Sequence, residues 1–114
     1  MPDATDPDNL IAGAWDNLDI STGGSVTTVL VGSSPLRRFI INFIGVRHSG
    51  DTETVTFQIQ LHESTNIIEL HSQDIQFAGG AGMTQGIENS NGSVAYGMVG
   101  RNNDAWIAAS DYVA

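Results

Sequence analysis

The sequence predicts an all-β fold: a single antiparallel β-sandwich or jelly-roll-like domain of about eight short strands, preceded by an N-terminal arm. Residues 53–61, ETVTFQIQL, give the first reason, because apolar and neutral polar side chains alternate there with the period of a strand. Segments of strand-like composition also recur roughly every 8–12 residues, as they do in sandwiches and barrels. No segment shows the apolar spacing of a helix.

Residues 1–14 are expected to form the arm, because proline and aspartate at its start disfavour regular structure, and residues 15–114 to form the domain. The apolar residues Leu10, Ile11 and Trp15 follow the acidic stretch directly. A tether that crosses to another subunit needs this arrangement. The alternative is a frayed terminus whose first strand begins near Trp15.

The central part of the chain predicts three long strands. Residues 25–32, SVTTVLVG, are rich in β-branched side chains. Residues 36–47, LRRFIINFIGVR, carry apolar side chains on both faces, which indicates a central strand or one covered by another subunit. A turn-rich HSGDT segment then leads into the alternating strand, so these two strands are expected to form a hairpin.

Shorter strands are expected in the second half of the chain. Residues 66–71 and 74–79 predict two separate strands, and residues 83–89 a weak edge strand. Residues 93–100 and 104–113 predict the last two strands.

Composition excludes several classes of function. The 114 residues suit one domain, and the absence of cysteine excludes disulfides, thiolate chemistry and a cysteine zinc site. Thirteen acidic residues against four arginines give a net charge of -9, which repels phosphate, so we expect no nucleic-acid and no membrane partner. The N-terminus resembles no secretory signal, and no stretch approaches the roughly 20 apolar residues of a membrane span.

The three histidines, His48, His62 and His71, are expected at exposed strand ends and turns. They lack the short spacing of a zinc site, which a cupin-like enzyme would need. If they gathered around a subunit axis, they would allow a metal or a pH-sensitive contact.

The remaining chemical candidates are weak. The acidic pairs Asp16 with Asp19 and Asp51 with Glu53 are expected to be solvated turn residues rather than glycosidase or calcium sites. The loop at residues 79–82 lacks the Lys-Ser/Thr that follows a phosphate-binding loop. We therefore expect no catalytic residue, no metal and no cofactor, and a protein that is not an enzyme.

Binding residues are expected on the surface. Exposed Tyr96, Trp106 and Tyr112 would suit a carbohydrate-binding or adhesin-like module, although large aromatics more often pack in a core or at a subunit contact. In a chain so poor in cations, either arginine of the adjacent pair is a candidate for an intersubunit salt bridge. The candidate capsid or subunit contacts are Leu10, Ile11, Trp15, Arg37, Arg38, Thr56, Gln58 and Gln60.

The order of segments SVTTVLV, LRRFIINFIGVRHSGDTE, ETVTFQIQL and the terminal SDYVA resembles small β-sandwich virion proteins of tailed bacteriophages, of the capsid decoration or head accessory type. The resemblance covers residues 25–114. The chain departs from it between Asp74 and Asn91, where a longer Gly-rich stretch stands.

This resemblance implies a non-enzymatic virion structural protein, a capsid decoration (cement) subunit on the outer capsid surface, made in the host cytoplasm. Its implied partner is the major capsid protein, and its implied oligomer is a homotrimer. The arm would anchor it to the capsid or to a sister subunit. A tail or head-fibre accessory subunit is the alternative within the same group.

Overall fold

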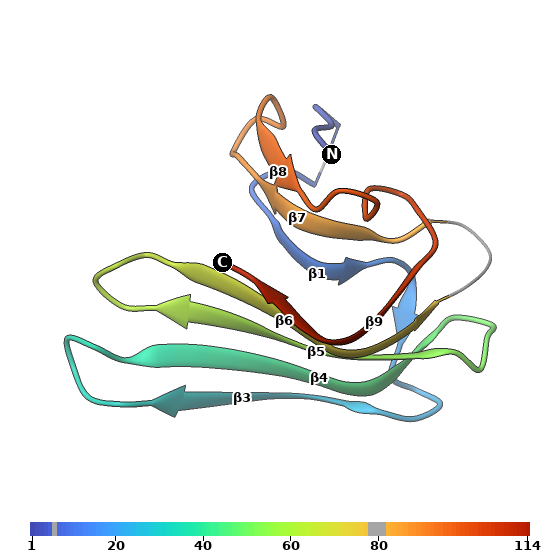
Figure 1. Ribbon diagram of the computed structural model, residues 1–114, viewed down its shortest axis with the longest axis horizontal. Coiled ribbons are helices and arrows are strands. Elements are labelled where there is room, and N and C mark those ends of the chain that lie inside the picture. The colour runs from blue at the N-terminus through green and yellow to red at the C-terminus, as the bar shows by residue number, and fades with distance from the viewer. Residues whose placement is uncertain (6, 78–81) are drawn as a thin grey trace. The chain divides into compact units, whose positions relative to one another are not determined.

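The computed structural model describes residues 1–5, 7–77 and 82–114, and these residues are all-β, in two antiparallel sheets (Figure 1). The predicted all-β class is confirmed, and two antiparallel sheets agree with a β-sandwich. The strands are β1 (Ile11–Trp15), β2 (Leu18–Asp19), β3 (Ser25–Val31), β4 (Arg38–His48), β5 (Thr54–His62), β6 (Ile68–Phe77), β7 (Thr84–Glu88), β8 (Ala95–Gly97) and β9 (Trp106–Val113).

The chain divides into two compact units. The small unit contains β1, β7 and β8 with the N-terminal residues, and it extends to Trp106. The large unit contains β2 to β6 and the remainder of β9 from Ile107 onward. Among the described residues, no helix is long and apolar enough to cross a membrane.

The sheet of the large unit has the strand order β2-β4-β5-β6-β9, and β3 also pairs with β4 (Figure 1). Consecutive hairpins join β3, β4, β5 and β6, so these four strands are neighbours both in sequence and in space. The predicted central position of the strand at residues 36–47 is confirmed, because β4 lies between β3 and β5.

Two β-bulges keep the buried apolar residues of this sheet on one face. On β4 the register shifts between Phe43 and Val46, and Gly45 within the shift has a φ of 57°. A bulge of this kind needs a left-handed residue, which glycine adopts without a steric cost. Beyond the bulge, Val46 pairs with Val55, and Val55 pairs with Ile75, so three fully buried side chains form one row across three strands.

The second bulge corrects one strand prediction. The two strands expected at residues 66–71 and 74–79 are one continuous strand, β6. Ser72 pairs with Phe57 and Asp74 pairs with Thr56, so Gln73 is the extra residue of a bulge rather than part of a turn. The bulge reverses the alternation of apolar and polar residues, which makes one strand read as two.

The sheet of the small unit has the order β1-β7-β8. The prediction of a weak edge strand at residues 83–89 is wrong, because β7 is central in this sheet and mostly buried. Residues 11–14, which were assigned to the arm, form most of β1. The Gly-rich loop considered for phosphate binding lies, at residues 79–81, outside the described residues.

Candidate interaction surfaces

An exposed apolar surface covers β3 and the beginning of β4, and we call it the β3–β4 surface. The register pairs Val26 with Phe43 and Leu30 with Phe39, and paired residues lie on the same face of a sheet. Leu30 is 56% exposed and Phe39 is 40% exposed. On the opposite face, Val29 is also exposed. Apolar side chains on both faces of one edge strand are therefore open to solvent.

The same apolar face is closed farther across the sheet. Phe57 on β5 is 3% exposed and stacks on Phe43, with the ring centroids 4.3 Å apart. Ile59 on β5 and Leu70 on β6 are also buried. The face thus changes from buried core at β5 and β6 to exposed surface at β3, without a change in its apolar character.

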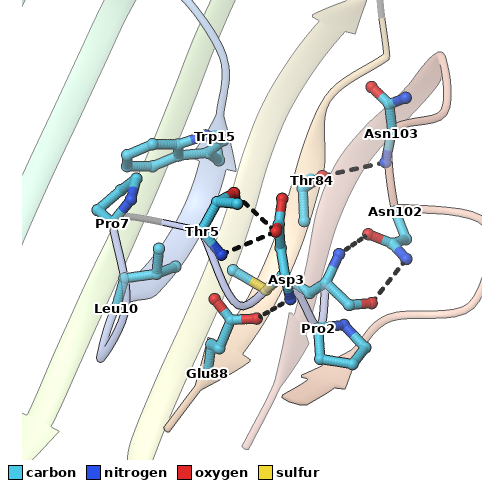
Figure 2. A pocket seen from close by; sticks show the side chains of 11 residues that line it. Pro2, Asp3, Thr5, Pro7, Leu10, Trp15, Thr84, Glu88, Asn102 and Asn103 are labelled. Atoms are coloured by element: carbon cyan, nitrogen blue, oxygen red, sulfur yellow. Dashed lines mark hydrogen bonds between the residues drawn. The ribbon is translucent and has the colours of Figure 1, made fainter. Parts of the chain in front are cut away.

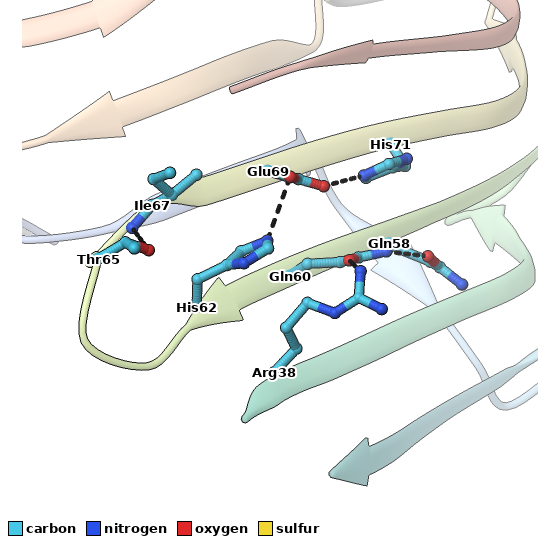
Figure 3. Close-up of polar contacts among 8 residues, drawn as sticks. All are labelled: Arg38, Gln58, Gln60, His62, Thr65, Ile67, Glu69 and His71. Carbon is cyan, nitrogen blue, oxygen red and sulfur yellow. Dashed lines mark hydrogen bonds and ion pairs between the residues drawn. The ribbon is translucent and has the colours of Figure 1, made fainter. Parts of the chain in front are cut away.

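The other face of the large sheet carries a polar row across β4, β5 and β6 (Figure 3). Arg38 Nη1 donates to Gln60 Oε1 at 3.2 Å, and Gln60 Nε2 donates to Gln58 Oε1 at 2.9 Å. Gln58 Nε2 in turn donates to Asn42 Oδ1 at 2.7 Å. These side chains satisfy one another along the row, so the row is a stiff network rather than a set of independent hydrogen-bonding groups.

Glu69 connects two histidines at the end of this row (Figure 3). Its Oε2 lies 2.6 Å from His71 Nε2, and its Oε1 lies 3.1 Å from His62 Nε2. The hydrogen bond with His71 holds the pKa of Glu69 below its ordinary value, and both histidines add to this effect. Among the described residues, no three His, Asp or Glu side chains form a group that could hold a metal ion.

An open cavity of about 270 Å³ lies at the end of the polar row, between β5, β6 and β9. Tyr112 forms one wall, and its ring stacks on His71 with the centroids 5.2 Å apart, while 67% of the residue stays exposed. Ser110, which also lines the cavity, has a φ of 57°, an uncommon conformation for a non-glycine residue within a strand. Gln58, Ser72, Gln73 and Asp111 complete the lining.

The small unit has a larger cavity, of about 500 Å³, with the N-terminal residues as part of its wall (Figure 2). Met1 N donates to Asn102 Oδ1 at 2.7 Å, and the backbone N–H of Asp3 donates to Glu88 Oε1 at 2.7 Å. Leu10 and Trp15 line the same cavity. In this structure the arm therefore folds back on its own unit, and its expected reach to a capsid or sister subunit stays a prediction.

Each of the two arginines proposed as intersubunit contacts has a partner within its own chain. Arg37 binds both oxygens of Glu63, with Nη2 2.6 Å from Oε1, and Arg38 joins the polar row. The hydroxyl of Thr56 accepts a hydrogen bond from Gly45 N at 2.9 Å and so ties down the β4 bulge. Gln60 is buried.

The structure buries Trp106, which agrees with the core-packing alternative, whereas the prediction of an exposed His48 is wrong. Trp106 is 7% exposed, and its indole N–H donates to the carbonyl of Met83 at 3.2 Å, so it offers no open ring to a sugar. The guanidinium of Arg101 lies 4.4 Å from its ring centroid. His48 is 4% exposed and stacks on Phe77, because the β4 bulge places it on the same face as Val46.

The strand pattern of residues 25–31 does not predict that β3 is exposed, although its composition carries one signal. Ser25–Val31 contains no charged residue and no proline, and a free edge strand in a monomer usually carries one of these. The contact of His71 with Tyr112 joins residues far apart in sequence, and no spacing rule predicts it.

A family model described as NIDO related matches residues 1–111, which is nearly the whole chain. No curated protein and no solved structure matches the chain.

Proposed function

We propose that this chain, which belongs to the NIDO-related family, is a non-enzymatic structural subunit that associates with copies of itself and with a larger protein lattice, as a capsid decoration subunit does. The family model matches residues 1–111 as one stretch. The role in a virion rests on the resemblance in segment order and on the surface described next.

The observation that supports this proposal is the β3–β4 surface. Val26, Leu30 and Phe39 form an exposed apolar patch on one face, and Val29 is exposed on the other. Exposed apolar patches of this kind are typical of a protein–protein contact. Core regions of such contacts are depleted in charge, and β3 contains no charged residue in a chain whose net charge is -9.

Binding of this kind would stabilise a shell by linkage. A subunit that binds the assembled lattice but not its dissociated parts shifts the equilibrium towards assembly. When several subunits are joined around a symmetry axis, the first subunit to bind the lattice brings the others close to their own sites. The oligomer therefore binds the lattice more tightly than a single subunit does.

The test is cosedimentation of the purified protein with assembled capsid shells that lack it, with dissociated major capsid protein as the control. The expected result is that the protein pellets with shells only and raises their melting temperature. A protein that pellets with neither sample and stays monomeric at every concentration overturns the proposal.

A second candidate function is carbohydrate binding, which the cavity beside Tyr112 favours. The ring of Tyr112 is exposed and is held by stacking on His71. Amide and hydroxyl groups line the cavity beside it, and this combination suits the binding of a neutral sugar. A glycan array separates this candidate from the first, because a lattice-binding subunit gives no hits.

A further inference from the structure

We propose that β3 pairs edge to edge and antiparallel with β3 of a second copy of this chain, around a two-fold axis at Thr28. This inference rests on the proposed function, since it names the partner of the β3–β4 surface. The pairing would join two sheets of the large unit into one continuous sheet. A two-fold axis is the commonest symmetry of a homo-oligomer and lets the same strand serve both copies.

The first argument is the open edge of β3. Its seven residues pair one to one with β4, from Ser25 with Ile44 to Val31 with Arg38, without a bulge. Within the described ranges, β4 is the one strand that pairs with β3. Its other side therefore presents backbone N–H and C=O groups in the geometry that a further strand needs.

The second argument is that β3 lacks the features that normally protect an edge. Natural edge strands carry lysine, proline, an inward charge or a bulge, or they are very short. β3 consists of serine, valine, threonine and leucine, and its residues from Ser25 to Leu30 are exposed. A strand of this kind would promote aggregation if it stayed unpaired, so we expect a specific partner to cover it.

The third argument concerns which partner fits. The chain carries a net charge of -9, so two copies repel each other over most of their surfaces. Two copies that pair through an uncharged strand bring no like charges opposite each other. A basic partner, in contrast, would be attracted to the acidic regions rather than to uncharged β3.

The register follows from the length of the strand. A two-fold axis at Thr28 pairs all seven residues of β3 with the seven of the second copy. It places Val26 opposite Leu30 of the second copy, and Thr27 opposite Val29. Apolar and β-branched pairs of this kind, with threonine facing threonine at the centre, are favourable across strands.

The chain has no cysteine, so a single introduced thiol tests the register. At the axis the two Thr28 Cα atoms would lie about 4.5–5.5 Å apart, within the roughly 4.4–6.8 Å that a disulfide spans. Under mild oxidation, Thr28→Cys should form a covalent dimer rapidly. The matched control is Thr52→Cys, another exposed threonine of the large unit, in the β4–β5 loop. Equal cross-linking rates for the two variants would overturn the register.

Charge variants test the pairing itself. Thr28→Asp and Thr28→Lys each place like charges across the axis and should weaken dimerisation at least about tenfold, as measured by sedimentation equilibrium. A mixture of the two variants should recover the dimer, which shows that each variant is folded. If neither variant changes the mass of the wild-type oligomer, or if the mixture stays monomeric, the pairing is refuted.

Shell binding is measured separately, so the two proposals can fail separately. Wild-type protein that binds shells as a monomer, or as a trimer insensitive to Thr28→Asp, refutes the β3 pairing and leaves the lattice role standing. Protein that dimerises through Thr28 but does not bind shells refutes the lattice role and leaves the pairing standing.

Discussion

The carboxylate of Glu63 holds Arg37 with both oxygens. Oε1 accepts from Nη2 at 2.6 Å, and Oε2 accepts from Nε at 2.8 Å and from the backbone N–H of Arg37 at 3.1 Å. These bonds hold the pKa of Glu63 at about 2, with the arginine side chain as the largest cause. The contact joins the segment that enters β4 to the segment that leaves β5, at the end of the β4–β5 hairpin.

Glu63 should therefore make the fold sensitive to acid. Its pKa is lower in the folded chain than its ordinary value of 4.5, so its stabilising contribution is fully present above pH 4.5 and is lost as the pH falls towards about 2. Glu63→Gln should lower the urea midpoint at pH 7 and flatten its pH dependence in this window. Arg37→Lys, which keeps the charge but loses the two-pronged contact, should give an intermediate loss. An unchanged pH profile in Glu63→Gln would contradict this assignment.

Two phenylalanines on the same face of the sheet should respond differently to truncation. Phe57→Ala should cost about 3–5 kcal/mol of unfolding free energy, because Phe57 is buried and stacks on Phe43. Phe39→Ala should cost only about 1–2 kcal/mol, because much of its surface is already in water. Chemical denaturation at low protein concentration measures both values.

Self-association should be affected more by Phe39→Ala than by Phe57→Ala, the reverse of the order for stability. Phe39→Ala should weaken the homo-oligomer, whereas Phe57→Ala should change its mass only where the fold is lost. Equal effects of the two variants on stability and on mass would remove the distinction between core and contact surface.

The small unit should depend on one buried amide. Gln85 Nε2 donates to the carbonyl of Gly13 at 3.1 Å, and its Oε1 accepts from Arg101 Nη1 at 2.7 Å. Gln85→Leu keeps the volume but removes both bonds, so it should cost about 1–3 kcal/mol. Gln76→Leu, at an exposed position of β6, should stay within about 0.5 kcal/mol of wild type. Hydrogen exchange should localise the loss of Gln85→Leu to the small unit, and protection loss confined to the large unit would contradict this role.

The carbohydrate candidate predicts a difference between two exposed tyrosines. If the cavity beside β9 binds a sugar, Tyr112→Ala should abolish binding on a glycan array. Tyr96→Ala, at an exposed residue of β8 outside that cavity, should leave binding unchanged. Binding that survives Tyr112→Ala, or that is lost with Tyr96→Ala, would place the sugar elsewhere.

The strands of the large unit were predictable because their signals are local. The alternation at residues 53–61 sets one face of β5, and the turn-rich segments before and after β4 and β5 create hairpins between neighbours in sequence. The two halves of β6 were misread for a physical reason. A single extra residue, Gln73, shifts the phase of the alternation, and only the pairing with β5 shows that the strand continues.

The candidate sites were less predictable than the strands. Thr56, Gln58 and Gln60 share the polar face, as their spacing predicts, but each of them hydrogen-bonds to β4, and Gln60 is buried. Trp106 and Tyr112 were expected on one face of the last strand. Instead Trp106 is buried and Tyr112 is exposed, and Ser110 between them has a left-handed backbone.

The sequence by itself determined the all-β class, the β4–β5 hairpin and the absence of charge on β3, because these depend on the period and type of nearby side chains. Only the tertiary structure decided which apolar residues are covered. Phe57 and Phe39 have the same side chain and lie on the same face, yet one is buried and the other is open to solvent. Burial depends on what packs above each position, and a strand's own pattern does not contain that information.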